Sequence, residues 1–147
     1  MNKVRINNFP HVSSKRLNLI EKVAKYCLND LNLPKVTISV EYASDMQRSD
    51  GICNGKYMID IVNKKDTNEL IDTIAHEIRH CYHHFYNVYN MDSNVYKRYK
   101  YDDLPWEVDA REYALKIVEY FNSWQSYFTM VLFIHNKGII YDKRRKT

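Results

Sequence analysis

The sequence contains few of the residues that break or cross-link a chain. Its 147 residues include only 3 Gly, 3 Pro and 3 Cys. So little Gly and Pro excludes collagen-like sequence and long low-complexity linkers. The hydrophobic fraction of 45% and the 13 Tyr are enough to fill a core. Because the length suits one domain and leaves no room for a second, we expect a single globular core.

Long hydrophobic runs are also absent. The longest apolar run extends only from Met130 to Ile134, far short of a membrane span. The first residues, Met1 to Asn7, lack the apolar centre of a signal peptide. We therefore expect no membrane segment and a cytoplasmic location.

The three cysteines, Cys27, Cys53 and Cys81, are well separated in the sequence and form no CxxC pair. This spacing excludes a zinc ribbon and a CxxC redox motif. We expect all three thiols to be reduced and buried.

The net charge of +4 comes from the end of the chain, where residues 137–147 contain five basic residues and one acidic residue. We therefore expect a neutral single domain over residues 1–136 and a basic C-terminal tail over residues 137–147. A short basic tail is usually a solvated terminus. Contact between this tail and nucleic acid is the less favoured alternative.

Hydrophobic periodicity predicts an α+β fold with a small antiparallel or mixed sheet. Turn residues Asn54 and Gly55 indicate a β-hairpin. The predicted elements are a helix over 13–33, a strand over 36–42, a hairpin ending at 62, a helix from 66 or 67 to about 88, a connection over 90–104, a helix from about 105 and a terminal helix over 124–134.

Within the second of these helices, His76 to His80 read HEIRH, a full HExxH motif. Residues four apart lie on one helical face, so His76 and His80 can bind one tetrahedral Zn²⁺. Glu77 is offset toward the position of a water ligand and is suited to act as general base. The alternative is a solvated polar face, because the two histidines lie opposite an apolar stripe of the helix.

A catalytic zinc site needs a third protein ligand. Glu107 is the candidate, because helical projection places it on the same stripe as the apolar residues Ala110, Ala114 and Phe121. A buried carboxylate needs a partner, which a metal would supply. The alternative is a first-turn glutamate that only favours the helix N-terminus.

The pair of motifs, HEIRH followed by Glu107 to Ile117 in the pattern ExxAxxYAxxI, resembles the zincin metallopeptidases of the ImmA/IrrE type. The Pro-Trp-Glu variant at Glu107 is similar to compact metallopeptidases of phages and prophages. The resemblance implies that His76, His80 and Glu107 are zinc ligands and that Glu77 is the catalytic acid and base. It also implies a minimal zincin-like α+β fold in which the hairpin strand before the histidine helix lies along the substrate cleft.

Two features depart from that family pattern. Arg79 stands where the ImmA/IrrE proteins often have Gly, and the connection from His80 to Glu107 is long. Proteases of the SprT type also contain HExxH, but their third ligand is usually His, and many add a zinc ribbon that this sequence lacks.

Several other polar residues lie near the two motifs, and we expect most of them to be ordinary surface or packing residues. His83 and His84 are expected at a solvated helix end. Asp72 or Asp109 is a candidate to orient a ligand imidazole. Tyr96, Tyr99 and Tyr101 lie in the connection, where a phenol could stabilise an oxyanion, and the sequence favours none of them.

The sequence therefore predicts a zinc metallopeptidase that hydrolyses a protein or peptide substrate. The alternative is a non-proteolytic or highly restricted regulatory or binding protein that keeps the zincin zinc site. A third reading is a structural α+β domain in which the HExxH motif is accidental. The sequence predicts neither the identity of the substrate nor the oligomeric state.

Overall fold

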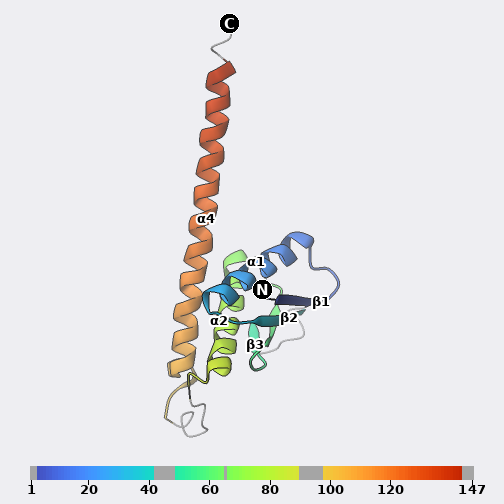
Figure 1. Ribbon diagram of the computed structural model, residues 1–147, viewed down its shortest axis with the longest axis vertical. Helices are drawn as coiled ribbons and strands as arrows, with labels where there is room; N and C mark the ends of the chain where they lie inside the picture. The colour runs from blue at the N-terminus through green and yellow to red at the C-terminus, as the bar shows by residue number, and fades with distance from the viewer. Residues whose placement is uncertain (1–2, 42–48, 65, 90–97, 144–147) are drawn as a thin grey trace. The chain divides into compact units, whose positions relative to one another are not determined.

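The computed structural model describes residues 3–41, 49–64, 66–89 and 98–143, with side chains described up to residue 124. The chain divides into two compact units, residues 1–117 and residues 118–147. The elements are β1 (Lys3–Asn8), α1 (Ser14–Asp30), β2 (Lys35–Glu41), β3 (Gly51–Cys53), β4 (Met58–Val62), α2 (Thr67–Tyr86), the 3₁₀ turn η1 (Tyr101–Asp103) and α4 (Pro105–Lys143) (Figure 1). The α+β class is confirmed.

The sheet has four strands in the order β1-β2-β4-β3. Strands β1, β2 and β4 are parallel, whereas β3 is antiparallel to β4. The sheet is therefore mixed, and the predicted hairpin is formed by β3 and β4. Its short strand β3 lies at one edge, with a strand partner on one side only among the described residues.

The two central strands bury one face. In β2 the residues Val36, Ile38 and Val40 are buried and alternate with less buried neighbours, and Ile59 and Ile61 do the same in β4. Helices α1 and α2 contact each other and the sheet. Since the sheet has one apolar face, both helices cover that face and close a two-layer core.

The sequence analysis missed β1. This strand offers only Val4 and Ile6 as alternating apolar residues, and its burial reaches only an intermediate level. It is stabilised by parallel pairing with β2, which joins Val4 to Val36 and Ile6 to Ile38. Such pairing is non-local, so periodicity within so short a segment does not reveal it.

Helix α4 begins at Pro105 and continues to Lys143 without a break. The predicted helix over residues 124–134 is confirmed as part of it. The backbone is still helical at residues 137–143, beyond the predicted start of the basic tail. The tail residues Arg144 to Lys146 lie outside the described residues, and the division at residue 136 stays a prediction.

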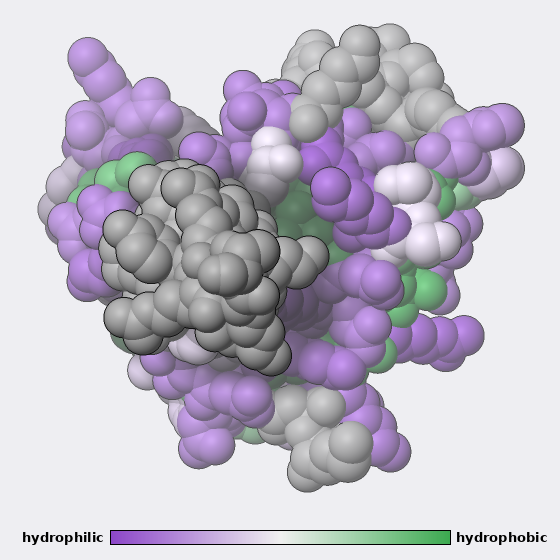
Figure 2. Space-filling model, turned by 90° about the horizontal axis from the view of Figure 1, so that it is seen from above, coloured by the Kyte–Doolittle hydropathy of each residue, from purple (hydrophilic) through white to green (hydrophobic). Residues whose placement is uncertain are grey.

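Hydrophilic residues dominate the face seen in Figure 2, where hydrophobic residues occupy small separate areas. Within the described ranges, none of the helices combines the length and the hydropathy needed to cross a bilayer.

Removing a core side chain from the central strand should destabilise the fold. Ile38 has no exposed surface. We expect Ile38→Ala to lower the free energy of unfolding by about 2–5 kcal/mol, because it leaves a cavity. Urea unfolding followed by circular dichroism measures this change. The control is Leu115→Ala, at a side chain 60% exposed, which should change stability by less than about 0.5 kcal/mol. Equal effects of the two variants would contradict this description of the core.

Candidate metal centre

Helix α2 supplies the two histidines of the HExxH motif. It starts as predicted, because the Asp66 side chain accepts a hydrogen bond from the Glu69 backbone N–H at 2.9 Å. Asn87 ends it in the left-handed conformation, with φ 51° and ψ 44°. One face of the helix is buried through Ile71, Ile74 and Ile78, and helical geometry places His76 and His80 on the opposite face.

The first turn of α4 supplies Glu107. Leu104, fully buried before the helix, accepts backbone hydrogen bonds from Glu107 at 2.9 Å and Val108 at 3.0 Å. The stripe predicted from the sequence is confirmed, because Ala110 and Ala114 are also fully buried. Glu107 therefore heads a row of core residues and is itself only 5% exposed.

The structure brings His76, His80 and Glu107 together. The two Nε2 atoms of the histidines lie 3.0 Å apart. Glu107 Oε2 is 3.3 Å from His76 Nε2, and Glu107 Oε1 is 3.5 Å from His80 Nε2. Within the described part of the chain, this is the one group of His, Cys, Asp and Glu side chains close enough to bind a metal ion.

These separations suit a tetrahedral metal ion. Bonds of about 2.0–2.1 Å at tetrahedral angles place neighbouring ligand atoms about 3.3 Å apart. The observed range of 3.0–3.5 Å brackets that value. Two imidazole nitrogens and one carboxylate are also a known ligand set of catalytic zinc sites, in which a fourth position stays open.

The two carboxyl groups of the site have opposite pKa shifts. Burial acts to raise the pKa of Glu107, but hydrogen bonds with His76 and His80 outweigh it and hold that pKa far below its usual range. Burial raises the pKa of Glu77, and the neighbouring Glu107 carboxylate adds to the rise, although the two histidines act against it. Glu107 is thus suited to be an ionised ligand, and Glu77 to exchange a proton.

A cavity of about 250 Å³ opens beside two of the three candidate ligands, His80 and Glu107. Its wall includes all three residues of β3 together with Glu77, His80, His84, Tyr101, Trp106 and Glu107. A second cavity, next to Asp72 and His76, shares Gly51, Glu77 and Glu107 with the first. The edge strand β3 therefore lies along the cavity beside the candidate metal centre.

Strand β3 approaches α2 closely at Gly51. A Cβ atom at this residue would lie 2.7 Å from Glu77 Cγ and 2.8 Å from Thr73 Cγ2. Next to this contact, the Cys53 backbone hydrogen-bonds the Glu77 carboxylate. Glycine at this position lets the strand hold the side chain of the candidate general base.

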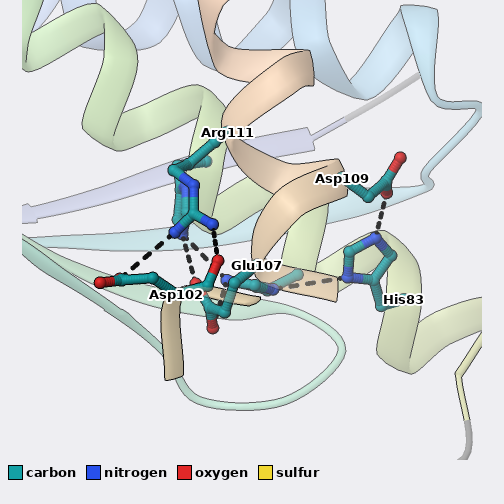
Figure 3. A network of polar contacts seen from close by, with 7 residues as sticks. His83, Asp102, Glu107, Asp109 and Arg111 are labelled. Atoms are coloured by element: carbon teal, nitrogen blue, oxygen red, sulfur yellow. Dashed lines mark hydrogen bonds and ion pairs between the residues drawn. The ribbon is translucent and has the colours of Figure 1, made fainter. Parts of the chain in front are cut away.

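The structure selects Tyr101 from the three tyrosines of the connection. Tyr101 lines both cavities and hydrogen-bonds Glu107. Arg111 of α4 fixes the turn that contains it, because the guanidinium donates to the backbone carbonyl and the carboxylate of Asp102 (Figure 3). Both Tyr99 and Tyr101 are exposed, but Tyr99 lines neither of these two cavities. Tyr96 lies outside the described residues.

Two predictions made for the end of α2 need correction. His83 was expected at a solvated helix end, but it is 1% exposed, and its ring contacts Asp109 of α4 and the ring of Tyr89. Burial lowers the pKa of His83 to about 4, so this imidazole is neutral at neutral pH. His84 is half-buried and lines the first cavity.

Of the two acidic residues expected to orient a ligand imidazole, Asp72 lines the second cavity. Burial acts to lower the pKa of His76, but the hydrogen bond with Glu107 and the charges of Glu77, Glu107 and, last, Asp72 raise it. Asp109 contacts Arg79 and His83 instead of a ligand.

The cysteines are free, as expected, but their burial differs from the prediction. Cys27 and Cys81 are buried, whereas Cys53 is half-buried and lines the first cavity. The Sγ atoms of Cys53 and Cys81 lie 3.5 Å apart. A pair of thiols therefore lies at the wall of this cavity, with Cys53 lining it and Cys81 in contact with Cys53.

Comparison of the chain with protein-family models, with curated proteins and with solved structures found no match. The functional argument therefore depends on the residues of the site and their geometry.

Adding a methyl group at Gly51 should disturb the contact between β3 and α2. We expect Gly51→Ala to lower the free energy of unfolding by about 1–3 kcal/mol, because Thr73 and Glu77 must move to admit the Cβ atom. Urea unfolding measures the change, with the exposed hairpin variant Lys56→Ala as control. Stability equal to that of the control would show that β3 does not pack against Glu77 as described.

Proposed function

We propose that the chain is a zinc-dependent metallopeptidase of zincin-like fold. The observation that supports this most strongly is the convergence of His76, His80 and Glu107 beside Glu77, next to two cavities to which the edge strand β3 contributes. Zinc is the metal favoured by two imidazoles and a carboxylate in a buried site.

The edge strand is the reason to propose a peptide substrate. One side of β3 has no strand partner among the described residues, and this strand lines the cavity beside Glu77. Backbone groups at a free sheet edge can pair with an extended peptide, which places a peptide bond next to the ligands. A protein or peptide is therefore the expected substrate.

In the proposed mechanism, the Nε2 atoms of His76 and His80 and the carboxylate of Glu107 would hold a zinc ion. Zinc bound there would supply Lewis acidity and would lower the pKa of a water ligand to about 7. Glu77 accepts a proton from the attacking water as the new C–O bond forms. It then donates this proton to the amine nitrogen as the peptide C–N bond breaks.

The metal content of purified protein tests the three ligands. We expect about one Zn²⁺ per wild-type chain, measured by plasma mass spectrometry on protein without a His-tag. His80→Ala and Glu107→Ala should lose or weaken this binding, because each leaves only two protein ligands. The control Glu112→Ala removes an exposed carboxylate of the same helix and should retain zinc. If the folded wild-type protein binds no zinc even after supplementation, the HExxH motif is accidental and the metal centre is refuted.

The role of Glu77 is tested separately from metal binding. We expect Glu77→Gln to keep its zinc and to reduce peptide cleavage by about 10²–10⁴-fold, because the amide cannot accept the proton. Cleavage of a peptide library, followed by mass spectrometry, measures this, with Glu112→Gln as control. Unchanged turnover in Glu77→Gln would refute the role of this residue. Zinc-loaded wild-type protein that cleaves no peptide would favour the regulatory or binding alternative.

A further inference from the structure

A chain of polar contacts extends from the back of His80 to α4. On the side away from the ligand group, His80 Nδ1 lies 3.4 Å from His83 Nδ1. The other nitrogen of His83, Nε2, lies 2.5 Å from Asp109 Oδ2 (Figure 3). Arg79 completes the chain, with Nε 2.7 Å from Asp109 Oδ2 and Nη2 3.2 Å from Oδ1.

One assignment of hydrogens satisfies every contact in this chain. If His80 Nε2 is a metal ligand, its neutral ring carries hydrogen on Nδ1. His83 Nδ1 must then accept that hydrogen bond, so the hydrogen of His83 is on Nε2 and points at Asp109. Arg79 donates two hydrogen bonds to the same carboxylate and keeps it in position as an acceptor.

His83 lies inside the protein, between α2 and α4. Its side chain is fully buried, and both ring nitrogens have partners in the polar chain. The two partners come from different elements, since His80 belongs to α2 and Asp109 to α4. Asp109 follows Glu107 by two residues in α4. The helical turn that contains Glu107 therefore also contacts, through His83, the imidazole of His80.

We propose that His83 and Asp109 are positioning residues that fix the ring orientation and the Nδ1–H tautomer of His80 for metal binding. This inference rests on the proposed function, because it needs His80 as a ligand. Partners of ligand imidazoles raise ligand basicity, and their loss typically reduces metal affinity about 10–100-fold. Here the carboxylate acts on the ligand through a second histidine.

Two variants of His83 separate positioning from packing. Phenylalanine keeps the planar shape but removes the acceptor, so His83→Phe should weaken zinc affinity about 10–100-fold and change the visible absorption of the Co²⁺-loaded protein. In His83→Gln the amide can accept from His80 and donate to Asp109, so affinity and spectrum should return toward wild type. The control Glu112→Gln, at an exposed position of α4, should match wild type.

Titrations of the wild-type and variant proteins with Zn²⁺ and Co²⁺ distinguish the failure of this inference from the failure of the proposed function. Wild-type protein that binds neither Zn²⁺ nor Co²⁺ would refute both the metal centre and the positioning role of His83 and Asp109. If the wild-type protein binds Zn²⁺ tightly and His83→Phe leaves the zinc affinity and the Co²⁺ spectrum unchanged, only the positioning role of His83 and Asp109 would be refuted.

A measurement on wild-type protein is independent of whether a variant folds. Long-range ¹H–¹⁵N NMR correlations of zinc-loaded protein report which nitrogen of each histidine carries hydrogen. We expect a neutral His83 with hydrogen on Nε2 and an unprotonated Nδ1. Hydrogen on His83 Nδ1 would overturn the proposal, because that nitrogen could not accept from His80.

Discussion

The pairing of the Glu107 carboxylate with the imidazoles of His76 and His80 is the interaction on which the arrangement of α2 and α4 depends. A carboxylate that is only 5% exposed is costly unless it is paired. Here two imidazoles contact it at 3.3 and 3.5 Å. The pairing places three ligand atoms at separations suited to one metal ion, so a metal would replace hydrogen bonds that the buried groups already need.

The remaining parts of the fold keep this group in place from two sides. The sheet places its edge strand β3 against α2 at Gly51, where the strand contacts Glu77. On the far side of His80, the contacts of Asp109 with Arg79 and His83 join the two ligand-bearing helices a second time. Glu77 and the candidate ligands therefore lie between a strand edge and a partly buried set of polar contacts, with a cavity open beside them.

Local patterns in the sequence predicted the features that depend on one helix. The spacing of His76 and His80, the Asp66 cap of α2 and the burial of Glu107 above Ala110 all follow from helical geometry. The features that were missed depend on distant partners. Strand β1 pairs with β2, and the buried His83 contacts Asp109 of another helix. No periodicity within α2 or the first eight residues contains that information.

The central claim is that His76, His80 and Glu107 form the metal centre, and X-ray absorption spectroscopy at the zinc edge tests it most directly. Wild-type protein loaded with one equivalent of Zn²⁺ should show only nitrogen and oxygen ligands at about 2.0–2.1 Å, with the outer-shell scattering of two imidazoles. A sulfur shell at about 2.3 Å would contradict the account. It would place the ion at Cys53 and Cys81, whose Sγ atoms lie 3.5 Å apart.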